Sequence, residues 1–175
     1  GTMDMEGKAP IGKLVRYDTD LNSSIVAEGF IISNGPAFSS SGDRIFVAET
    51  GQNKNIKKGI YSFDITLENK LTNKTFIIDW SSQNSSPDGL ITDNYGNLWV
   101  GEWNGNNIYN YNSDGKIIQS IQVPFYNPTK MAFGGKNYDT LYITSAKFSL
   151  DNEKLNQYPG TGGVFSIKLP FNGNP

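Results

Sequence analysis

The chain has 175 residues, 37% of them hydrophobic and 13% aromatic, and a formal net charge of −2. This length and composition predict one globular unit with a sizeable core, and the balanced charge excludes the basic face that nucleic acid or an anionic membrane would require. The sequence contains neither cysteine nor histidine. Cysteine nucleophiles, Ser-His-Asp triads and imidazole or thiolate metal sites are therefore excluded, and any metal must be held by oxygen.

Short runs rich in β-branched and aromatic residues follow one another along the chain. In order they are RIFVAE (44–49), GIYSFDI (59–65), TFIIDW (75–80), NLWVGEW (97–103), NIYNYN (107–112), LYITSA (141–146) and GVFSIKL (163–169). Runs of this length between turn residues predict an all-β protein. The pairs Asn104-Gly105 and Asp114-Gly115 each follow a strand and predict hairpin turns. One short helical turn is expected within residues 149–158.

Three segments share a single layout: a polar opening, an apolar strand, a glycine turn and a second apolar strand. They are residues 33–50, 86–103 and 127–146, and they open with Asn34, Asp88 and Thr129. A repeat of about 40 to 50 residues with several strands in each unit is typical of β-propeller blades. The sequence therefore predicts one part-propeller domain over residues 1–175. Its expected parts are a partial blade (1–32) and three blades (33–80, 84–123 and 127–170).

About three blades and a partial one are fewer than the roughly four to eight with which propellers close. A part-propeller leaves open sheet edges and an uncovered face. We therefore expect either a fragment or a subunit that is completed by another polypeptide, which is the missing N-terminal half of the propeller or a second copy of the chain. No apolar run is long enough to span a bilayer, so we expect a soluble protein that does not bind membranes. Whether it is cytoplasmic or secreted stays open.

The openings of the repeats are the candidate site. The innermost strands of neighbouring blades converge on a central channel, which makes neighbours of Asn34 and Asp88. Carboxylate and carboxamide oxygens are ligands for hard divalent cations. The alternative is that both are plain turn residues, because Asn-Gly and Asp-Gly are common turn pairs.

Tryptophans and glutamates near these openings have two interpretations each. Trp103 could stack on a sugar ring, whereas Trp99 lies inside an apolar run and is expected in the core. Glu49 and Glu102 end equivalent strands. They could face the channel, but solvated strand ends are the simpler expectation.

The same segments resemble the regucalcin, senescence-marker-protein and gluconolactonase family of sugar lactonases. The stretches ISNGPAFSSSGDRIFVAET, PDGLITDNYGNLWVGEWNGNNI, PTKMAFGGKNYDTLYITSA and YPGTGGVFSI follow in the order of that family's C-terminal half, and GTMDMEGKAPIGKLVRYD is similar to its mid-chain segment. The resemblance implies a six-bladed propeller that binds one divalent cation. That cation is commonly Ca²⁺, with Mg²⁺, Mn²⁺ or Zn²⁺ as alternatives.

The resemblance also implies residue roles and an activity. Asn34 and Asp88 match metal ligands, and Asp88 matches the catalytic base or water-orienting group. A substrate-contacting acid maps to Glu6, with Asp4 as the substitute. The implied enzyme is a hydrolase in which metal-activated water attacks a sugar lactone or related carboxylic ester. The other ligands of the family lie outside this sequence, so the chain alone is expected to bind metal weakly and to be inactive unless complemented. The alternative is a non-catalytic propeller that binds a cation or another protein.

Overall fold

The structure, a computed structural model, describes residues 1–173 and is all-β apart from one short helix. The strands are β1 (Gly12–Tyr17), β2 (Ser23–Phe30), β3 (Ser33–Phe38), β4 (Arg44–Glu49), β5 (Gly59–Ile65), β6 (Leu71–Asp79), β7 (Ser86–Thr92), β8 (Leu98–Trp103), β9 (Asn107–Tyr111), β10 (Ile117–Gln122), β11 (Pro128–Gly134), β12 (Thr140–Ser145) and β13 (Val164–Lys168). The helix α1 (Asn152–Gln157) lies between β12 and β13. The all-β prediction and the short helical turn are confirmed.

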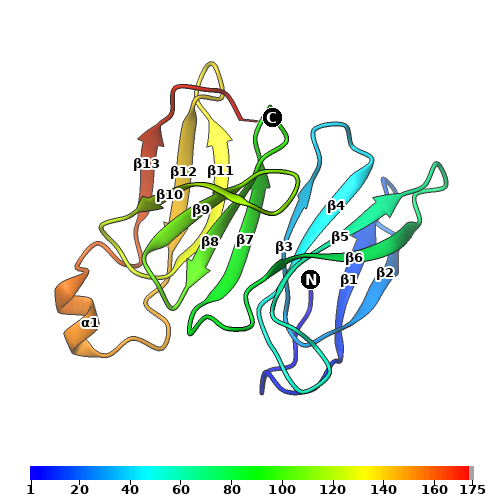
Figure 1. The fold of residues 1–175 in the computed structure, drawn as a ribbon, viewed down its shortest axis with the longest axis horizontal. Coiled ribbons are helices and arrows are strands. Elements are labelled where there is room, and N and C mark those ends of the chain that lie inside the picture. Colours follow the sequence, from blue (N-terminus) through cyan, green and yellow to red (C-terminus); the bar gives the residue numbers. More distant parts are fainter. Residues whose placement is uncertain (174–175) are drawn as a thin grey trace.

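The strands form four separate antiparallel sheets in chain order: β1–β2, β3–β6, β7–β10 and β11–β13 (Figure 1). Each sheet joins strands that are consecutive in the sequence, so every connection within a sheet is a simple turn or loop. Both predicted hairpin turns are confirmed, because Asn104-Gly105 joins β8 to β9 and Asp114-Gly115 joins β9 to β10.

Each pair of successive sheets encloses its own apolar core, and strand β4 shows why. Ile45 and Val47 pack with Phe30 in the core against the first sheet, whereas Phe46 and Ala48 point to the opposite face and belong to the core shared with the third sheet. Side chains alternate between the two faces of a strand. Residues 45–48 of this strand are all apolar because both faces of its sheet are buried.

Strand β8 repeats this arrangement one sheet further on. Leu98 and Val100 face the core shared with the second sheet, and Trp99 faces the core shared with the fourth. Trp99 is fully buried and its ring meets that of Phe133 at a centroid distance of 6.4 Å. The expectation that Trp99 is a core residue is confirmed.

The first strands of three sheets, β3, β7 and β11, lie beside one another (Figure 1). Glycine allows this approach: a Cβ on Gly89 would collide with the Thr129 carbonyl, and one on Gly101 would lie 2.7 Å from the Pro128 carbonyl oxygen. Segments opened by Asn34, Asp88 and Thr129 are therefore neighbours in space, as the repeat predicts.

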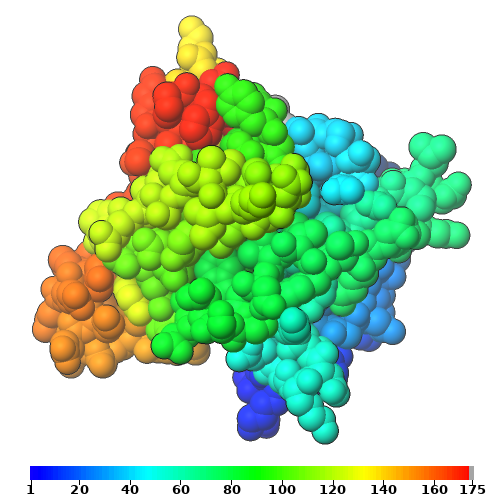
Figure 2. All heavy atoms as spheres, in the orientation of Figure 1, coloured from blue at the N-terminus to red at the C-terminus, as the bar shows by residue number. Residues whose placement is uncertain are grey.

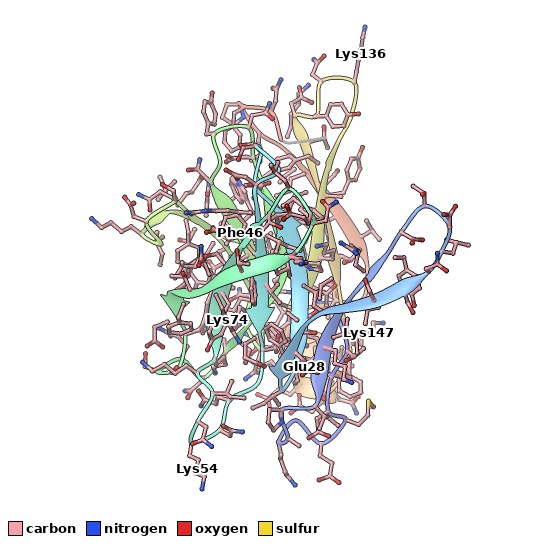
Figure 3. All side chains as sticks on the ribbon, turned by 90° about the vertical axis from the view of Figure 1, so that its right-hand side faces the viewer. Glu28, Phe46, Lys54, Lys74, Lys136 and Lys147 are labelled. Atoms are coloured by element: carbon pink, nitrogen blue, oxygen red, sulfur yellow. The ribbon has the colours of Figure 1, made fainter. Side chains whose placement is uncertain are left out.

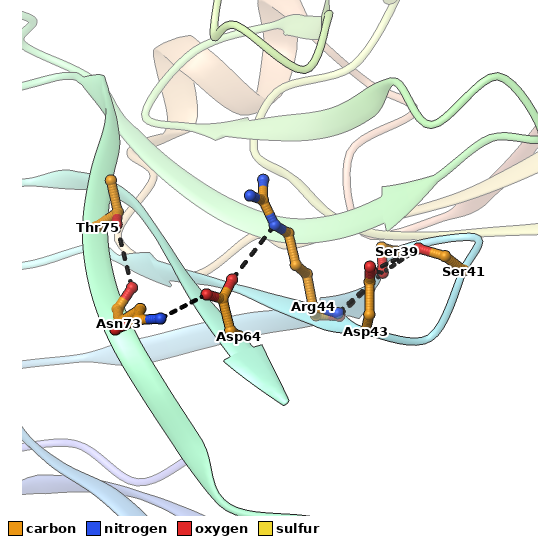
Figure 4. A network of polar contacts seen from close by, with 7 residues as sticks. All are labelled: Ser39, Ser41, Asp43, Arg44, Asp64, Asn73 and Thr75. Carbon is orange, nitrogen blue, oxygen red and sulfur yellow. Dashed lines mark hydrogen bonds and ion pairs between the residues drawn. The ribbon is translucent and has the colours of Figure 1, made fainter. Parts of the chain in front are cut away.

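The outer strands and turns carry the polar surface. Segments coloured green to yellow-green, which belong to the end of the second sheet and to the third sheet, cover the centre of the face in Figure 2. On the second sheet, Arg44 pairs with Asp64, which also accepts a hydrogen bond from Asn73, in the network of Figure 4. Lys54 and Lys136 project from opposite ends of the molecule (Figure 3). Within residues 1–173, no helix is both long and apolar enough to cross a membrane.

Candidate metal and substrate site

A β-bulge interrupts the beginning of each of the three inner strands. The ladder shifts by one residue between Asn34 and Ala37 in β3, between Pro87 and Leu90 in β7 and between Pro128 and Lys130 in β11. A bulge leaves one residue unpaired and redirects the side chains around it. This repeated irregularity presents Asn34 and Asp88 to a common space.

That space is a cavity of about 380 Å³ between the N-terminal segment and the openings of β3 and β7. It is lined by Met3, Asp4, Met5, Glu6, Gly7, Ile32, Asn34, Thr50, Asp88, Trp103 and Phe148. All four residues predicted for the site line it. Thr129, the third opening residue, does not line the cavity. Its hydroxyl forms a hydrogen bond with the Thr144 hydroxyl at 2.8 Å.

Thr50 fixes the orientation of the Asn34 amide. The Thr50 hydroxyl donates its hydrogen to the Pro87 carbonyl oxygen at 2.7 Å, so its oxygen can only accept from Asn34, whose Nδ2 lies 3.3 Å away. The Asn34 Oδ1 atom is thereby left as the free acceptor, and none of the hydrogen bonds among residues 1–173 ends on it. Sequence reasoning missed Thr50, although its place directly after β4 could have suggested it.

Asp88 is 8% exposed, and no donor among residues 1–173 hydrogen-bonds to its carboxylate. Burial raises the pKa of Asp88 to about 7, and the positive charge of Lys130 acts in the opposite direction. A buried carboxylate without a hydrogen-bond donor is costly when ionised. Asp88 is therefore suited to hold a cation or to exchange a proton near neutral pH.

The two acidic residues of the N-terminal segment have different surroundings. The Asp4 carboxylate accepts hydrogen bonds from the backbone amides of Glu6, Lys8 and Ala9 at 3.2, 2.8 and 2.7 Å. These bonds lower the pKa of Asp4 and commit the side chain to closing its own turn. Glu6 is exposed, and among residues 1–173 its carboxylate pairs only with Lys8, at 3.4 Å. Of the two, Glu6 is the one free to meet a ligand.

An aromatic pair also lines the cavity. The rings of Trp103 and Phe148 lie 6.3 Å apart between centroids. Buried Asn127 holds the two segments together, because its Oδ1 accepts from the Asn104 amide at 2.8 Å and its Nδ2 donates to the Phe148 carbonyl oxygen at 3.4 Å. Asn127 and Phe148 were not predicted from the sequence, since the contacts that give them a role join separate loops.

The expectation of solvated strand ends is wrong for both glutamates. Glu49 is fully buried, and its carboxylate accepts from the amides of Ile31, Ile32 and Gly51 at 2.8, 2.8 and 3.0 Å. Glu102 is also buried and accepts from the Asn107 side chain at 2.8 Å. Both carboxylates accept hydrogen bonds from backbone amides beside the end of their strands, because buried backbone donors need a partner.

A sequence profile of the SMP-30/gluconolactonase/LRE-like region matches residues 1–147. The chain belongs to this family. Among its relatives, 6-deoxy-6-sulfogluconolactonase from Pseudomonas putida is 28% identical over 159 residues, covering 90% of this chain and 53% of the relative. Regucalcin from Gallus gallus is 33% identical over 138 residues, which cover 78% of this chain and 44% of regucalcin. The chain thus spans about half the length of these members of the family.

A solved structure confirms the fold of this member of the SMP-30/gluconolactonase/LRE-like family. The crystal structure of regucalcin, a calcium-binding protein from Agrobacterium tumefaciens, superposes with a TM-score of 0.84 at 21% identity, over 98% of this chain and 56% of that one. The family resemblance seen in the sequence is confirmed by the profile match over residues 1–147. The four sheets correspond to slightly more than half of a larger fold.

The oxygen atoms present in the cavity fit a hard cation. Asn34 Oδ1 and the Asp88 carboxylate both lack a hydrogen-bond donor among the described residues, and both line the cavity. Residues 1–173 contain no cluster of three or more acidic side chains that could hold a metal. Ca²⁺ usually takes six to eight oxygens, so two donors would make up only part of such a shell.

We predict that the metal-free chain loses stability as the pH rises from about 4 to 7. The pKa of Asp88 is raised to about 7 in the folded protein, so the folded state binds the proton more tightly than the unfolded state does. Between the two pKa values, the free energy of unfolding should fall by about 1.4 kcal/mol for each pH unit. Urea unfolding at pH 5 and pH 8 measures the loss. The Asp88→Asn variant should lose less stability than wild type over this range. An equal loss in both proteins would contradict the assignment, because burial also raises the pKa of Glu49.

Proposed function

We propose that the chain forms three blades and part of a fourth in a β-propeller. Residues 33–80, 84–123 and 127–170 would be the blades, and residues 1–32 the partial one. The proposal is supported by the separate sheets with first strands side by side, and by coverage of 44% to 56% of the relatives and the solved structure. Phe38 is 57% exposed and Val164 70% exposed, which leaves apolar surface for the remaining blades to cover.

We propose further that the completed propeller is a divalent-cation-dependent hydrolase of sugar lactones or related esters. The observation that carries the proposal is the pair of free oxygen donors, Asn34 Oδ1 and the Asp88 carboxylate, that line one cavity. The name of the Pseudomonas putida relative supports a lactone substrate, and that of the Agrobacterium tumefaciens regucalcin supports Ca²⁺. A complementing segment or a second copy would supply the other ligands.

Each residue has a specific part in this proposal. Asn34 and Asp88 would hold the cation, which when bound would polarise the lactone carbonyl and lower the pKa of water beside it. Asp88, which the bound cation would keep ionised, would orient the attacking water and accept its proton. Glu6 would accept hydrogen bonds from ring hydroxyls. Trp103 and Phe148 would pack against the apolar face of the ring.

A non-catalytic cation-binding or protein-interaction role is the second candidate. The observation that favours it is that only two donors come from the described part of the chain, which is too few for tight binding by this chain alone. Folds of this kind also support many unrelated functions. Calorimetric binding of Ca²⁺ together with inertness toward a panel of lactones would select this role.

The experiment that tests the enzyme is hydrolysis of a simple aldonolactone, followed by proton release. Ca²⁺ or Mn²⁺ is supplied and then removed with a chelator. The chain is assayed alone and again after extension upstream of Gly1. Turnover that appears with metal and stops with chelator supports the lactonase, whereas metal binding without turnover in both proteins rejects it.

We predict that Glu6→Gln raises KM several-fold and leaves the free energy of unfolding within about 0.5 kcal/mol, because an exposed carboxylate contributes little to stability. Asp4→Ala should instead lower the urea midpoint of unfolding, since three backbone amides lose their acceptor. Steady-state kinetics and urea unfolding of both variants check this division. If neither variant changes KM, the N-terminal segment is not part of the substrate site.

A further inference from the structure

Lys130 connects three sheets through its ammonium group. The residue lies on β11, yet its Nζ atom donates to the carbonyl oxygens of Leu90 on β7 at 2.7 Å and of Gly35 and Pro36 on β3 at 3.2 and 3.4 Å. An ammonium has three N–H donors, and here each has an acceptor. The residue is exposed at the surface, but the charged end of its side chain contacts backbone carbonyls of two other strands.

The carbonyls that Lys130 binds belong to the bulges that carry the candidate ligands. Gly35 and Pro36 lie between Asn34 and Ala37, where the β3 ladder is shifted. Leu90 closes the corresponding shift in β7, directly after Asp88 and Gly89. Each contact therefore lies one to two residues from a proposed metal ligand.

No backbone ladder joins β3 to β7, because they belong to different sheets. The distance between their bulges depends on packing and on side chains that cross from one strand to the other. Gly35, at φ +91°, is so close to β7 that a Cβ would lie 3.0 Å from the Leu90 side chain. Thr92 forms a separate link at the other end of the strands, from its hydroxyl to the Phe38 carbonyl oxygen at 2.7 Å.

We propose that Lys130 is a positioning residue that sets the distance between the Asn34 and Asp88 oxygens by holding both bulges on one ammonium. The inference rests on the cation site of the proposed function. Charged hydrogen bonds to several acceptors are stronger than neutral ones, so this link is stiffer than a hydroxyl contact. Lys130 itself does not line the cavity and is not a ligand.

The test compares Lys130→Met, which keeps the aliphatic stem and removes the ammonium, with Thr92→Val, which removes a link between the same two strands away from the bulges. Lys130→Arg restores a donor group of the same charge. Tb³⁺, a luminescent substitute for Ca²⁺, is titrated with excitation through tryptophan, because Trp103 lines the cavity. Hydrogen–deuterium exchange of the metal-free chain is measured at residues 34–38 and 87–91.

We expect Lys130→Met to weaken Tb³⁺ binding about tenfold and to speed amide exchange at both bulges, with partial recovery in Lys130→Arg. Thr92→Val should bind Tb³⁺ within twofold of wild type, even though it lowers stability. If Lys130→Met matches Thr92→Val in affinity and in bulge exchange, the positioning role is overturned. If wild type binds no Tb³⁺, the two donors of this chain do not hold a cation without the complementing ligands, and exchange at the bulges then decides by itself whether Lys130 holds them.

Discussion

Asp88→Asn is expected to reduce lactone hydrolysis by about 10²–10⁴-fold in the form of the protein that turns over. The substitution keeps the shape of the side chain but removes the group that would accept the proton from water, and it removes a negative charge from the proposed cation site. The fold should be unaffected. Steady-state rates of aldonolactone hydrolysis and the circular dichroism spectrum measure the two effects.

Asp114→Asn is the matched control, because Asp114 also precedes a glycine but lies in the exposed turn between β9 and β10. It should leave the rate unchanged. The metal-free Asp88→Asn protein should also be more stable than wild type at pH 8, since it no longer buries an ionised carboxylate. A wild-type rate in Asp88→Asn would reject the catalytic role of Asp88, whatever the stability data show.

Glu49→Ala is expected to lower the free energy of unfolding by about 3–5 kcal/mol. The fully buried carboxylate is the acceptor for the amides of Ile31, Ile32 and Gly51, and alanine would leave all three donors without a partner. Burial raises the pKa of Glu49, but these three hydrogen bonds act against that rise. Urea denaturation at pH 7 measures the change.

Glu68→Ala is the control, because Glu68 is exposed in the turn between β5 and β6 and its loss should change stability by less than about 0.5 kcal/mol. Glu102→Ala should fall between the two, since the Glu102 carboxylate accepts fewer backbone amides than that of Glu49. A loss below about 1 kcal/mol in Glu49→Ala would mean that water replaces the carboxylate at the end of the sheet.

The sequence was sufficient for most of the strands, although none of the apolar runs or repeated segments corresponds to β1, β2 or β10. The runs around Val47 and Trp99 are apolar on both faces because each of these strands lies in a sheet with a core on either side. Dipeptides that end in glycine, such as Asp114-Gly115, correctly predicted hairpin turns, because the conformation of a turn depends on its own residues. The repeat also identified Asn34 and Asp88 as equivalent positions, and the structure places both on one cavity.

The sequence could not predict the local environment of each candidate site residue. Asp4 and Glu6 are two residues apart and chemically similar, yet one carboxylate is used in a turn and the other is free. Glu49 resembles a solvated strand end in the sequence but is fully buried. These differences arise from which backbone amides the folded chain brings within hydrogen-bonding distance.

The sequence by itself therefore determined the all-β class, the family and two candidate ligands, because strand periodicity, turn chemistry and motif order are properties of neighbouring residues. Only the tertiary structure decided how those ligands are held. The Asn34 amide is oriented by Thr50 and Pro87, which lie 16 and 53 residues away in sequence, and Lys130 reaches Gly35 across 95 residues. Contacts of this range form only when separate sheets pack together, so no local pattern records them.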